Sequence, residues 1–362
     1  MKRSENTPTT SYRSLLLRLA VFLLAGAVLI GGITALFDPF YLYHAPFFGI
    51  PAVLDDRDNQ MPGTVRNFTY DSVLVGSSVA ENFNTDRLDA ARGTRTLKVI
   101  RSTGSAADLL YYLEMAEEDH NLQQVIWCLD LFALLSAPEP TLPEAGVSYV
   151  QSASPLDDLP YLFNKEILFR TIPTMLGKAL QGENTGGNAY NWAEGKDFSP
   201  AGAMRHYDRP VGIPFPTEQA PLSEERKSLA DENLSAILTY VDAHPDTAFT
   251  FLYPPYSLLY WDSIYINGMS AEYLYAKEAS MEGLLARPNV RVFDFQTEKY
   301  ITDLNLYMDM MHYHPSINDH MLDCLETGAC RVTADQIPER IDALKSLMEE
   351  ISGEAIYRYY PE

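Results

Sequence analysis

The stretch DSVLVGSS, residues 71–78, decides the fold of this chain. Its first five residues are dominated by the apolar and β-branched types that favour a strand. The strand then runs into a lone glycine and two serines, and the residues that follow look like the start of a helix. A buried strand does not need two hydroxyl groups on the tight turn at its end, which raises the question of what they do.

Similar apolar runs recur along the chain and alternate with segments of helical periodicity. We expect further strands at 96–100, 124–130, 247–253 and 290–295, and helices at 106–119, 164–180, from about 223, at 270–286 and at about 335–351. Strands that are apolar throughout and alternate with amphipathic helices are typical of a parallel sheet covered on both faces. The sequence therefore predicts an α/β fold with a doubly wound, mainly parallel, five-stranded sheet.

A long apolar segment precedes this domain. Residues 19–37 contain no charged side chain, and as a helix they would reach about 28 Å, close to the hydrocarbon thickness of a bilayer. Basic residues come before the segment and acidic residues after it, so the positive-inside rule places the amino terminus in the cytoplasm and the rest outside. A cleaved signal peptide is the alternative, but no convincing cleavage site follows the apolar run.

These features divide the chain into four parts. We expect a cytoplasmic tail at 1–14, a transmembrane anchor in the lipid bilayer at 15–37, an irregular connection at 38–69 and the α/β domain at 70–362. Within the domain, residues 131–221 are rich in proline and glycine and are expected to form an insertion or cap. The main domain is thus predicted to be extracytoplasmic on a single-pass membrane protein.

The formal net charge of −22 argues against a nucleic-acid partner, because phosphate binding needs a basic surface.

The chain has three cysteines. Cys128 lies in an apolar run and is expected in the core. Cys324 and Cys330 have a spacing that a short-loop disulfide could join in an oxidising compartment, and no pair has zinc-finger spacing.

Polar residues follow the predicted strands. Ser77 and Ser78 follow the first strand, Gly104 follows the second, and Asp130 follows the third. Past the fifth strand, the segment MDMMHYHPSINDH (308–320) brings Asp309 and His312. Ligands bind beyond the carboxyl ends of the strands in open parallel sheets, so these residues are expected at one edge.

A serine with an Asp-x-x-His pair is a set that can perform nucleophilic catalysis. A serine hydroxyl attacks well only when a neutral imidazole takes its proton, and a carboxylate holds that imidazole in the right tautomer. We therefore expect Ser78 as nucleophile, His312 as base and Asp309 as the residue that orients it. The hydroxyl of Ser77 would brace the turn.

Three alternatives stand beside this interpretation. Gly-Ser-Ser after a strand is often only a turn. His312 and His314 together with Asp309 have the donor types of a metal site, but no other cluster offers further ligands, so neither a metal nor a cofactor is expected. Tyr256, Tyr260 and Trp261 could stack on sugar rings or simply pack in the core.

The segments VLVGSS and DMMH resemble the first and last blocks of the SGNH hydrolase family, the GDSL-type serine esterases. The resemblance assigns Ser78 as the nucleophile and Asp309 and His312 as the last block. It places Ser77 where the family often has aspartate. It also implies that the amide of Gly104 helps to form the oxyanion hole.

One position departs from the family pattern. The third block normally supplies an asparagine to the oxyanion hole, and here LDLF offers Asp130. An ionised aspartate would repel a developing oxyanion and could cost a few kcal/mol of transition-state stabilisation.

The Gly-Ser-Ser variant with HYHP is more similar still to membrane-anchored, exported relatives that act in polysaccharide O-acetylation and teichoic-acid D-alanylation. The resemblance implies a serine esterase or O-acyltransferase that acts on acetyl-type groups of cell-envelope saccharides. Its partners would be an envelope polysaccharide and a membrane-bound O-acyltransferase. The alternative is a catalytically inactive SGNH-fold partner or binding protein of such a system.

Overall fold

A six-stranded sheet forms the centre of the protein in a computed structural model, which describes residues 12–47, 49–141, 154, 156–182, 186–209 and 219–359. The strand order is β2-β1-β3-β4-β5-β6. The strands are β1 (Ser72–Gly76), β2 (Thr96–Ile100), β3 (Gln124–Cys128), β4 (Ala248–Tyr253), β5 (Val290–Asp294) and β6 (Arg331–Val332). The first five strands are parallel, and β6 pairs antiparallel with β5.

The sequence correctly predicted a mainly parallel sheet, but the count of five strands was wrong. The missing strand, β6, has two residues, and a strand that short shows no alternation that a sequence pattern could reveal. The five predicted strands are almost entirely buried, which explains why they read as continuous apolar runs.

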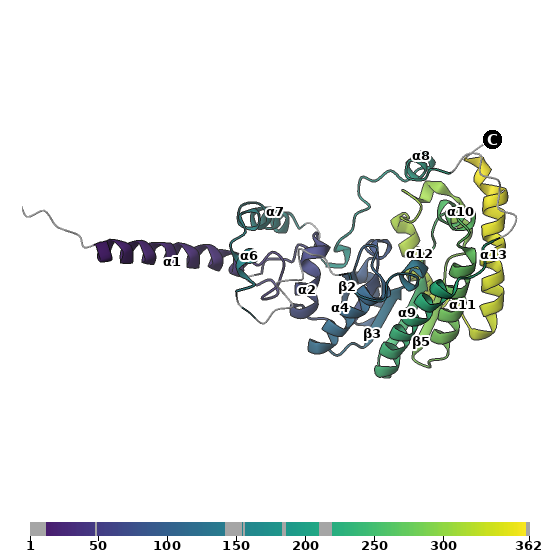
Figure 1. Cartoon of the computed structure of the whole chain (residues 1–362), viewed down its shortest axis with the longest axis horizontal. Helices are drawn as coiled ribbons and strands as arrows, with labels where there is room; N and C mark the ends of the chain where they lie inside the picture. Colours follow the sequence, from purple (N-terminus) through teal and green to yellow (C-terminus); the bar gives the residue numbers. More distant parts are fainter. Residues whose placement is uncertain are drawn as a thin grey trace, which may run out of the picture.

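Thirteen α-helices are found in the described part of the chain. Figure 1 labels most of them. They are α1 (Tyr12–Phe37), α2 (Arg57–Asn67), α3 (Thr85–Arg92), α4 (Ala106–Asp119), α5 (Leu131–Leu134), α6 (Leu159–Leu162), α7 (Ile172–Gln181), α8 (Pro200–Met204), α9 (Glu224–Ala243), α10 (Leu258–Ile266), α11 (Ser270–Leu285), α12 (Pro315–Thr327) and α13 (Ile337–Gly353). Helix α4 matches its predicted bounds, because Ser105 and Asp108 form a capping box that fixes its start.

The segment 38–69, predicted to be irregular, contains helix α2. The pattern hid it because Pro62 lies inside the helix and its apolar residues have no clear period. Tertiary contacts hold it instead. A Cβ on Gly63 would lie 2.2 Å from the carbonyl oxygen of Phe40, so only glycine allows this close approach of the helix to the neighbouring backbone.

The described parts of the predicted insertion, 131–221, pack against two different regions of the protein. Its helix predicted at 164–180 is found as a π-helical turn, η2 (Ile167–Thr171), followed by α7. Together with α6, this part packs against the end of α1 through a small apolar cluster that includes Tyr161 and Phe37. The later part, 186–209, instead packs on the main core near the sheet edge.

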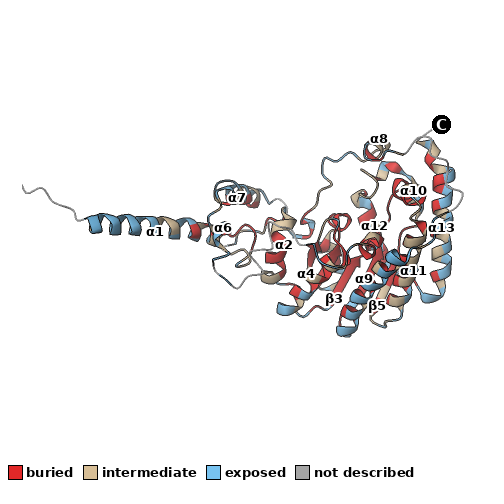
Figure 2. Ribbon diagram, in the orientation of Figure 1, coloured by how far each residue is buried: buried red, intermediate tan, exposed pale blue. Residues whose placement is uncertain are grey.

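Helix α1 is the one helix in the described ranges that is long and apolar enough to cross a membrane, with a mean hydropathy of 2.5 over its most apolar window. Figure 2 shows exposed residues along most of its length. Only its last turns pack against the rest of the chain, where Gly31 and Thr34 are buried. The predicted anchor, 15–37, lies within α1, whereas residues 1–11 of the predicted tail lie outside the described residues.

The order of the strands reverses at β1. Strand β2 lies on one side of β1 and β3 on the other, so the connections after β1 and β3 leave in opposite directions. The amide of Arg101 donates to the carbonyl of Gly76 at 3.0 Å, which aligns the ends of β1 and β2. Such a reversal point opens a crevice at the carboxyl edge of a parallel sheet, and Ser77 and Ser78 begin there.

Candidate active site

Ser78, His312 and Asp309 form a hydrogen-bonded chain at this edge. The Oγ atom of Ser78 lies 2.7 Å from Nε2 of His312, and Nδ1 of His312 lies 2.7 Å from Oδ2 of Asp309. The side chains of His312 and Asp309 are 24% and 20% exposed, so solutes can reach the group. The serine, base and carboxylate that the sequence selected are therefore brought together in the order that nucleophilic catalysis requires.

A close turn after β1 presents Ser78. The serine opens the 3-10 turn η1 (Ser78–Ala80) directly after the strand. A Cβ on Gly76 would lie 2.8 Å from Cβ of Ala80 and 3.0 Å from Cβ of Cys128, so a larger residue would push this turn away from β3. The amide of Ser78 is the first in η1, and the first amides of a helix have no acceptor within it. The turn thus presents both a hydroxyl and an amide.

A short hairpin carries the other two residues. Tyr307 and Tyr313 form an isolated antiparallel bridge, and both rings are buried. Within the hairpin, Oδ1 of Asp309 accepts hydrogen bonds from the amides of Met311 and His312, each at 2.8 Å. Burial alone would raise the pKa of Asp309, but its interactions with His312 and these amides hold the pKa below its usual value. Asp309 is thus fixed as a carboxylate.

Trp192 is a part of the site that sequence reasoning missed. Its indole N–H donates to the carbonyl of Ser78 at 3.0 Å, and its ring meets the ring of His312 edge to face, with centroids 5.1 Å apart. Its own amide donates to Oδ1 of Asn82 at 3.1 Å. The residue therefore contacts both the turn that carries Ser78 and the ring of His312. It lies in a stretch, NAYNWAEG, whose sequence indicates only a loop.

A buried lysine ties this loop to the nucleophile turn. Nζ of Lys98 in β2 donates to the carbonyls of Glu81 at 2.6 Å and Ala189 at 2.7 Å. Burial lowers the pKa of Lys98 to about 7 and raises the pKa of Glu81 to about 7. Arg57 pairs with Glu81 from α2. A lysine in the middle of an apolar strand was the sequence signal that could have revealed this arrangement.

Asp130 lies beside Ser77 at the end of β3. It is fully buried, and burial raises the pKa of Asp130 to about 6, against the lowering effects of Tyr256, Ser77 and the charge of His312. The hydroxyl of Tyr256 donates to Oδ1 of Asp130, and Oδ2 has no hydrogen-bond partner among the described residues. Asp130 is thus near the triad of Ser78, His312 and Asp309, and it becomes ionised as the pH rises through about 6.

Gly104 does not take the position that the resemblance implies. Its amide donates to the carbonyl of Arg101 at 3.0 Å, within the turn that leads into α4. A Cβ there would lie 2.6 Å from the side chain of Arg101, so glycine is needed for this turn. The amide is thus engaged in local structure rather than directed at the reacting centre.

The other aromatic and histidine residues have structural positions. Tyr256, Tyr260 and Trp261 are buried in the main core, which answers the question of their role in favour of packing. His314 caps α12 and lies 2.9 Å from the hydroxyl of Ser316 through Nδ1. His314 is therefore not joined to Asp309 as a metal pair would be.

An open, polar cavity of about 840 Å³ lies next to the hairpin that carries His312, because its lining includes His314, although none of Ser78, His312 and Asp309 lines it. Its walls include Phe198, Lys196, Glu194 and His314, and the ring of Phe198 stacks on Trp192 at 6.3 Å between centroids. This volume lies in the range of small-molecule sites. The ring of Phe198 next to polar side chains suits a ligand that has both apolar faces and hydroxyl groups.

Comparisons of this chain with protein-family models, with curated proteins and with solved structures find no significant match. Any assignment of function therefore depends on the geometry described above.

Proposed function

We propose that this protein is a membrane-anchored serine esterase or O-acyltransferase of the SGNH type, acting on acetyl-type groups of cell-envelope saccharides. The single observation that carries the proposal is the chain of two 2.7 Å contacts from Ser78 through His312 to Asp309. The strand order 2-1-3-4-5, with the serine at the point where the order reverses, supports a doubly wound fold of this kind.

The reaction would follow the usual course for a serine nucleophile. Oγ of Ser78 attacks the acyl carbonyl while Nε2 of His312 takes the hydroxyl proton, and Asp309 stabilises the imidazolium that forms. The amide of Ser78 donates to the developing oxyanion. His312 then protonates the leaving alcohol, and an acyl group remains on Ser78. Water or a saccharide hydroxyl, deprotonated by His312, takes the acyl group in the second half.

The cavity next to the hairpin of His312 supports a saccharide as the acyl carrier. Sugars present apolar C–H faces that pack on aromatic rings and hydroxyl groups that bond to polar side chains. Phe198, which stacks on Trp192, offers the first kind of surface, and Asn188, Asn191 and Glu194 offer the second. The strongly acidic chain favours a neutral or cation-bridged polymer over a bare polyanion.

We further propose that α1 anchors the protein with its amino terminus in the cytoplasm and the sheet domain outside. The basic residues before the apolar segment and the acidic residues after it support this orientation. A carboxyl-terminal alkaline phosphatase fusion should be active in cells, whereas a green fluorescent protein fusion at the same place should stay dark. The reverse pattern would refute the orientation.

A second candidate function is a non-catalytic binding protein of a membrane O-acyltransferase. Two observations favour it: Asp130 stands where an oxyanion donor is expected, and the amide of Gly104 is engaged in a turn. The two candidates separate in one experiment. The full chain in detergent is assayed for hydrolysis of 4-nitrophenyl acetate and of an O-acetylated oligosaccharide, beside Ser78→Ala and the remote control Ser235→Ala on α9.

An esterase loses its activity in Ser78→Ala and keeps it in Ser235→Ala. A binding protein shows no turnover in any of the three proteins, although it still binds the saccharide.

A further inference from the structure

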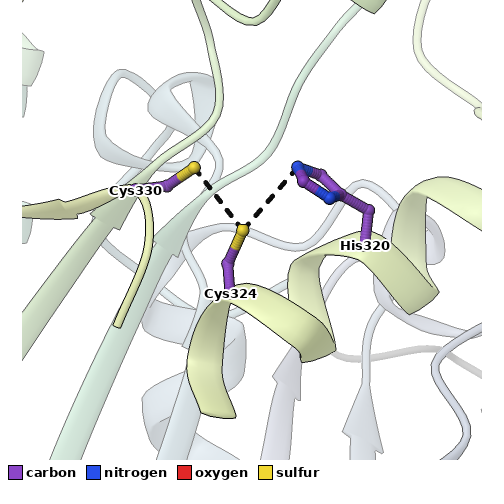
Figure 3. Close-up of side chains that lie close together, drawn as sticks. All are labelled: His320, Cys324 and Cys330. Carbon is purple, nitrogen blue, oxygen red and sulfur yellow. Dashed lines mark hydrogen bonds between the residues drawn. The ribbon is translucent and has the colours of Figure 1, made fainter. Parts of the chain in front are cut away.

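Three side chains outside the candidate active site converge near the end of α12, and a fourth contacts one of them. They are His320 and Cys324 on α12, Cys330 just before β6, and Glu298 in the loop after β5. Figure 3 shows the first three directed toward one another. The ligand atoms of His320, Cys324 and Cys330 all lie within 4.8 Å of one another. The proposed function uses none of these residues.

Three distances between these donor atoms are close to the edges of a tetrahedral metal site. Sγ of Cys324 lies 3.5 Å from Sγ of Cys330 and 3.6 Å from Nε2 of His320, and Sγ of Cys330 lies 3.6 Å from Oε1 of Glu298. Zinc bonds of about 2.3 Å to sulfur and about 2.0–2.1 Å to nitrogen or oxygen give tetrahedral edges of about 3.3–3.8 Å, the longest between two sulfurs. The donors of His320, Cys324 and Cys330 are thus near the spacing that the ion requires, and Glu298 contacts this group through Cys330.

Local structure prepares this geometry. His320 and Cys324 are four residues apart on α12 and therefore share one face of the helix. Gly328, with φ +78°, ends the helix, and Cys330, with φ +58°, continues the turn that brings its thiol back over the helix. A non-glycine residue in the left-handed region is uncommon and often marks a functional position.

We propose that His320, Cys324, Cys330 and Glu298 bind one zinc ion as a closed structural site. Two sulfurs, one imidazole nitrogen and one carboxylate oxygen in a tetrahedron are a donor set that selects Zn²⁺. Binding releases both thiol protons to solvent, so the two thiolates and the carboxylate leave the site with one net negative charge. The proposal departs from the sequence-based expectation of no metal, which considered the histidines near Asp309.

The ion would join three weakly connected elements. Strand β6 has only two residues and is an edge strand, and Glu298 lies in the loop that follows β5. Helix α12 begins at Pro315, three residues after His312. A metal ion bound near the carboxyl end of α12 would therefore fix the helix that follows the hairpin of His312. The site would therefore stabilise the fold and keep the hairpin of the triad in place.

A disulfide between Cys324 and Cys330 is the competing use of the two thiols. Both are free thiols in the structure. A disulfide would join two of the four donors and leave the positions of His320 and Glu298 without a reason. The convergence of His320 on the two thiols, with Glu298 beside Cys330, therefore favours the metal.

Metal analysis of the full chain, purified in detergent, tests the proposal. Mass spectrometry of the elements should find about one zinc per chain in the wild type and in the controls Cys128→Ala and His206→Asn. The variants Cys324→Ser, Cys330→Ser and His320→Asn should lose it, and Glu298→Gln should bind zinc about tenfold or more weakly.

A second measurement does not depend on the folding of these variants. A chelator should lower the melting temperature of the wild type, and Zn²⁺ but not Mg²⁺ should restore it. Co²⁺ should give the intense visible absorption of a tetrahedral site together with a thiolate charge-transfer band. Wild-type protein without zinc and without a response to Zn²⁺ or Co²⁺, unchanged zinc content in the cysteine and histidine variants, or a quantitative Cys324–Cys330 disulfide would each overturn the proposal.

Discussion

The Oγ atom of Ser78 and the Nε2 atom of His312 lie 2.7 Å apart, although 234 positions separate the two residues in the sequence. The turn after β1 supplies the serine, and the hairpin that precedes α12 supplies the histidine. The strand order brings these two distant segments to one edge of the sheet. The contact makes a hydroxyl that is inert by itself into a candidate nucleophile.

Replacement of Asp309 with asparagine should lower kcat of ester hydrolysis by about 10³–10⁴-fold with little change in KM. The amide would hold His312 in the wrong tautomer and would no longer stabilise the imidazolium. Steady-state kinetics on a small acetyl ester measures the effect, with Asp335→Asn, an exposed position on another element, as the control. A loss below about tenfold would show that Asp309 does not orient the base.

Replacement of Asp130 with asparagine should raise kcat/KM at pH 8 several-fold and have little effect at pH 5. The pKa of Asp130 is raised to about 6, so the residue is ionised at pH 8, where its charge opposes the oxyanion, and largely neutral at pH 5. The ratio of mutant to wild-type activity, measured across pH 5–8, should therefore rise through about pH 6. A ratio that does not change with pH would contradict an electrostatic role.

Asp130→Asn should also change how the stability of the protein depends on pH. Because the folded pKa of Asp130 lies above the usual value, the ionised form is disfavoured in the folded state. The wild type should accordingly lose stability as pH rises from about 4 through 6, and Asp130→Asn should remove this part of the pH dependence. Melting temperatures of the two proteins across this range provide the check. Parallel curves would count against the burial of a titrating carboxyl here.

Substitutions of Trp192 should separate its two contacts. Trp192→Phe removes the hydrogen bond to the carbonyl of Ser78 but keeps an aromatic ring against His312, and kcat should fall a few-fold. Trp192→Ala removes both contacts, and kcat should fall about 10–100-fold. A matched control is Trp192→Tyr, which also keeps a ring. Equal losses for phenylalanine and alanine would assign the whole effect to the hydrogen bond.

Removal of Lys277 should destabilise the protein strongly. Its Nζ lies 2.8 Å from Oδ2 of Asp294, and both side chains are fully buried between α11 and the end of β5. Lys277→Met leaves an unpaired buried carboxylate and should lower the free energy of unfolding by about 3–5 kcal/mol. The exposed control Lys345→Met should change it by no more than about 0.5 kcal/mol. Equal melting temperatures for the two variants would refute this.

Much of the sheet could be predicted from the sequence, because five of its strands are short apolar runs separated by turn residues. Strand β6 could not be predicted, because a strand of two residues shows no alternation of apolar and polar positions. Helix α2 could not be predicted either, because the close packing at Gly63 holds it rather than a periodic pattern. The helix α12 was also not predicted. It begins at Pro315, the last residue of the His-Tyr-His-Pro segment, whose sequence indicates site residues rather than a helix.

The triad was accessible from sequence because each member follows a strand or lies in a recognisable motif. The position of Trp192 could not be predicted from the sequence, because it depends on how a loop folds back over Ser78. Gly104 matches the motif of the family, but its amide donates a hydrogen bond to the neighbouring carbonyl of Arg101. A match in sequence therefore does not establish the role of the amide. The convergence of His320, Cys324 and Cys330 also depends on the turn at Gly328, which sequence spacing alone does not reveal.

The most direct test of the central claim is labelling of the full chain in detergent with a fluorophosphonate probe, with the modified residue located by peptide mass spectrometry. We expect a covalent label on Ser78 in the wild type and in Ser77→Ala, and no label in Ser78→Ala. An unlabelled but folded wild type, or labelling that persists in Ser78→Ala, would contradict an activated serine at this site.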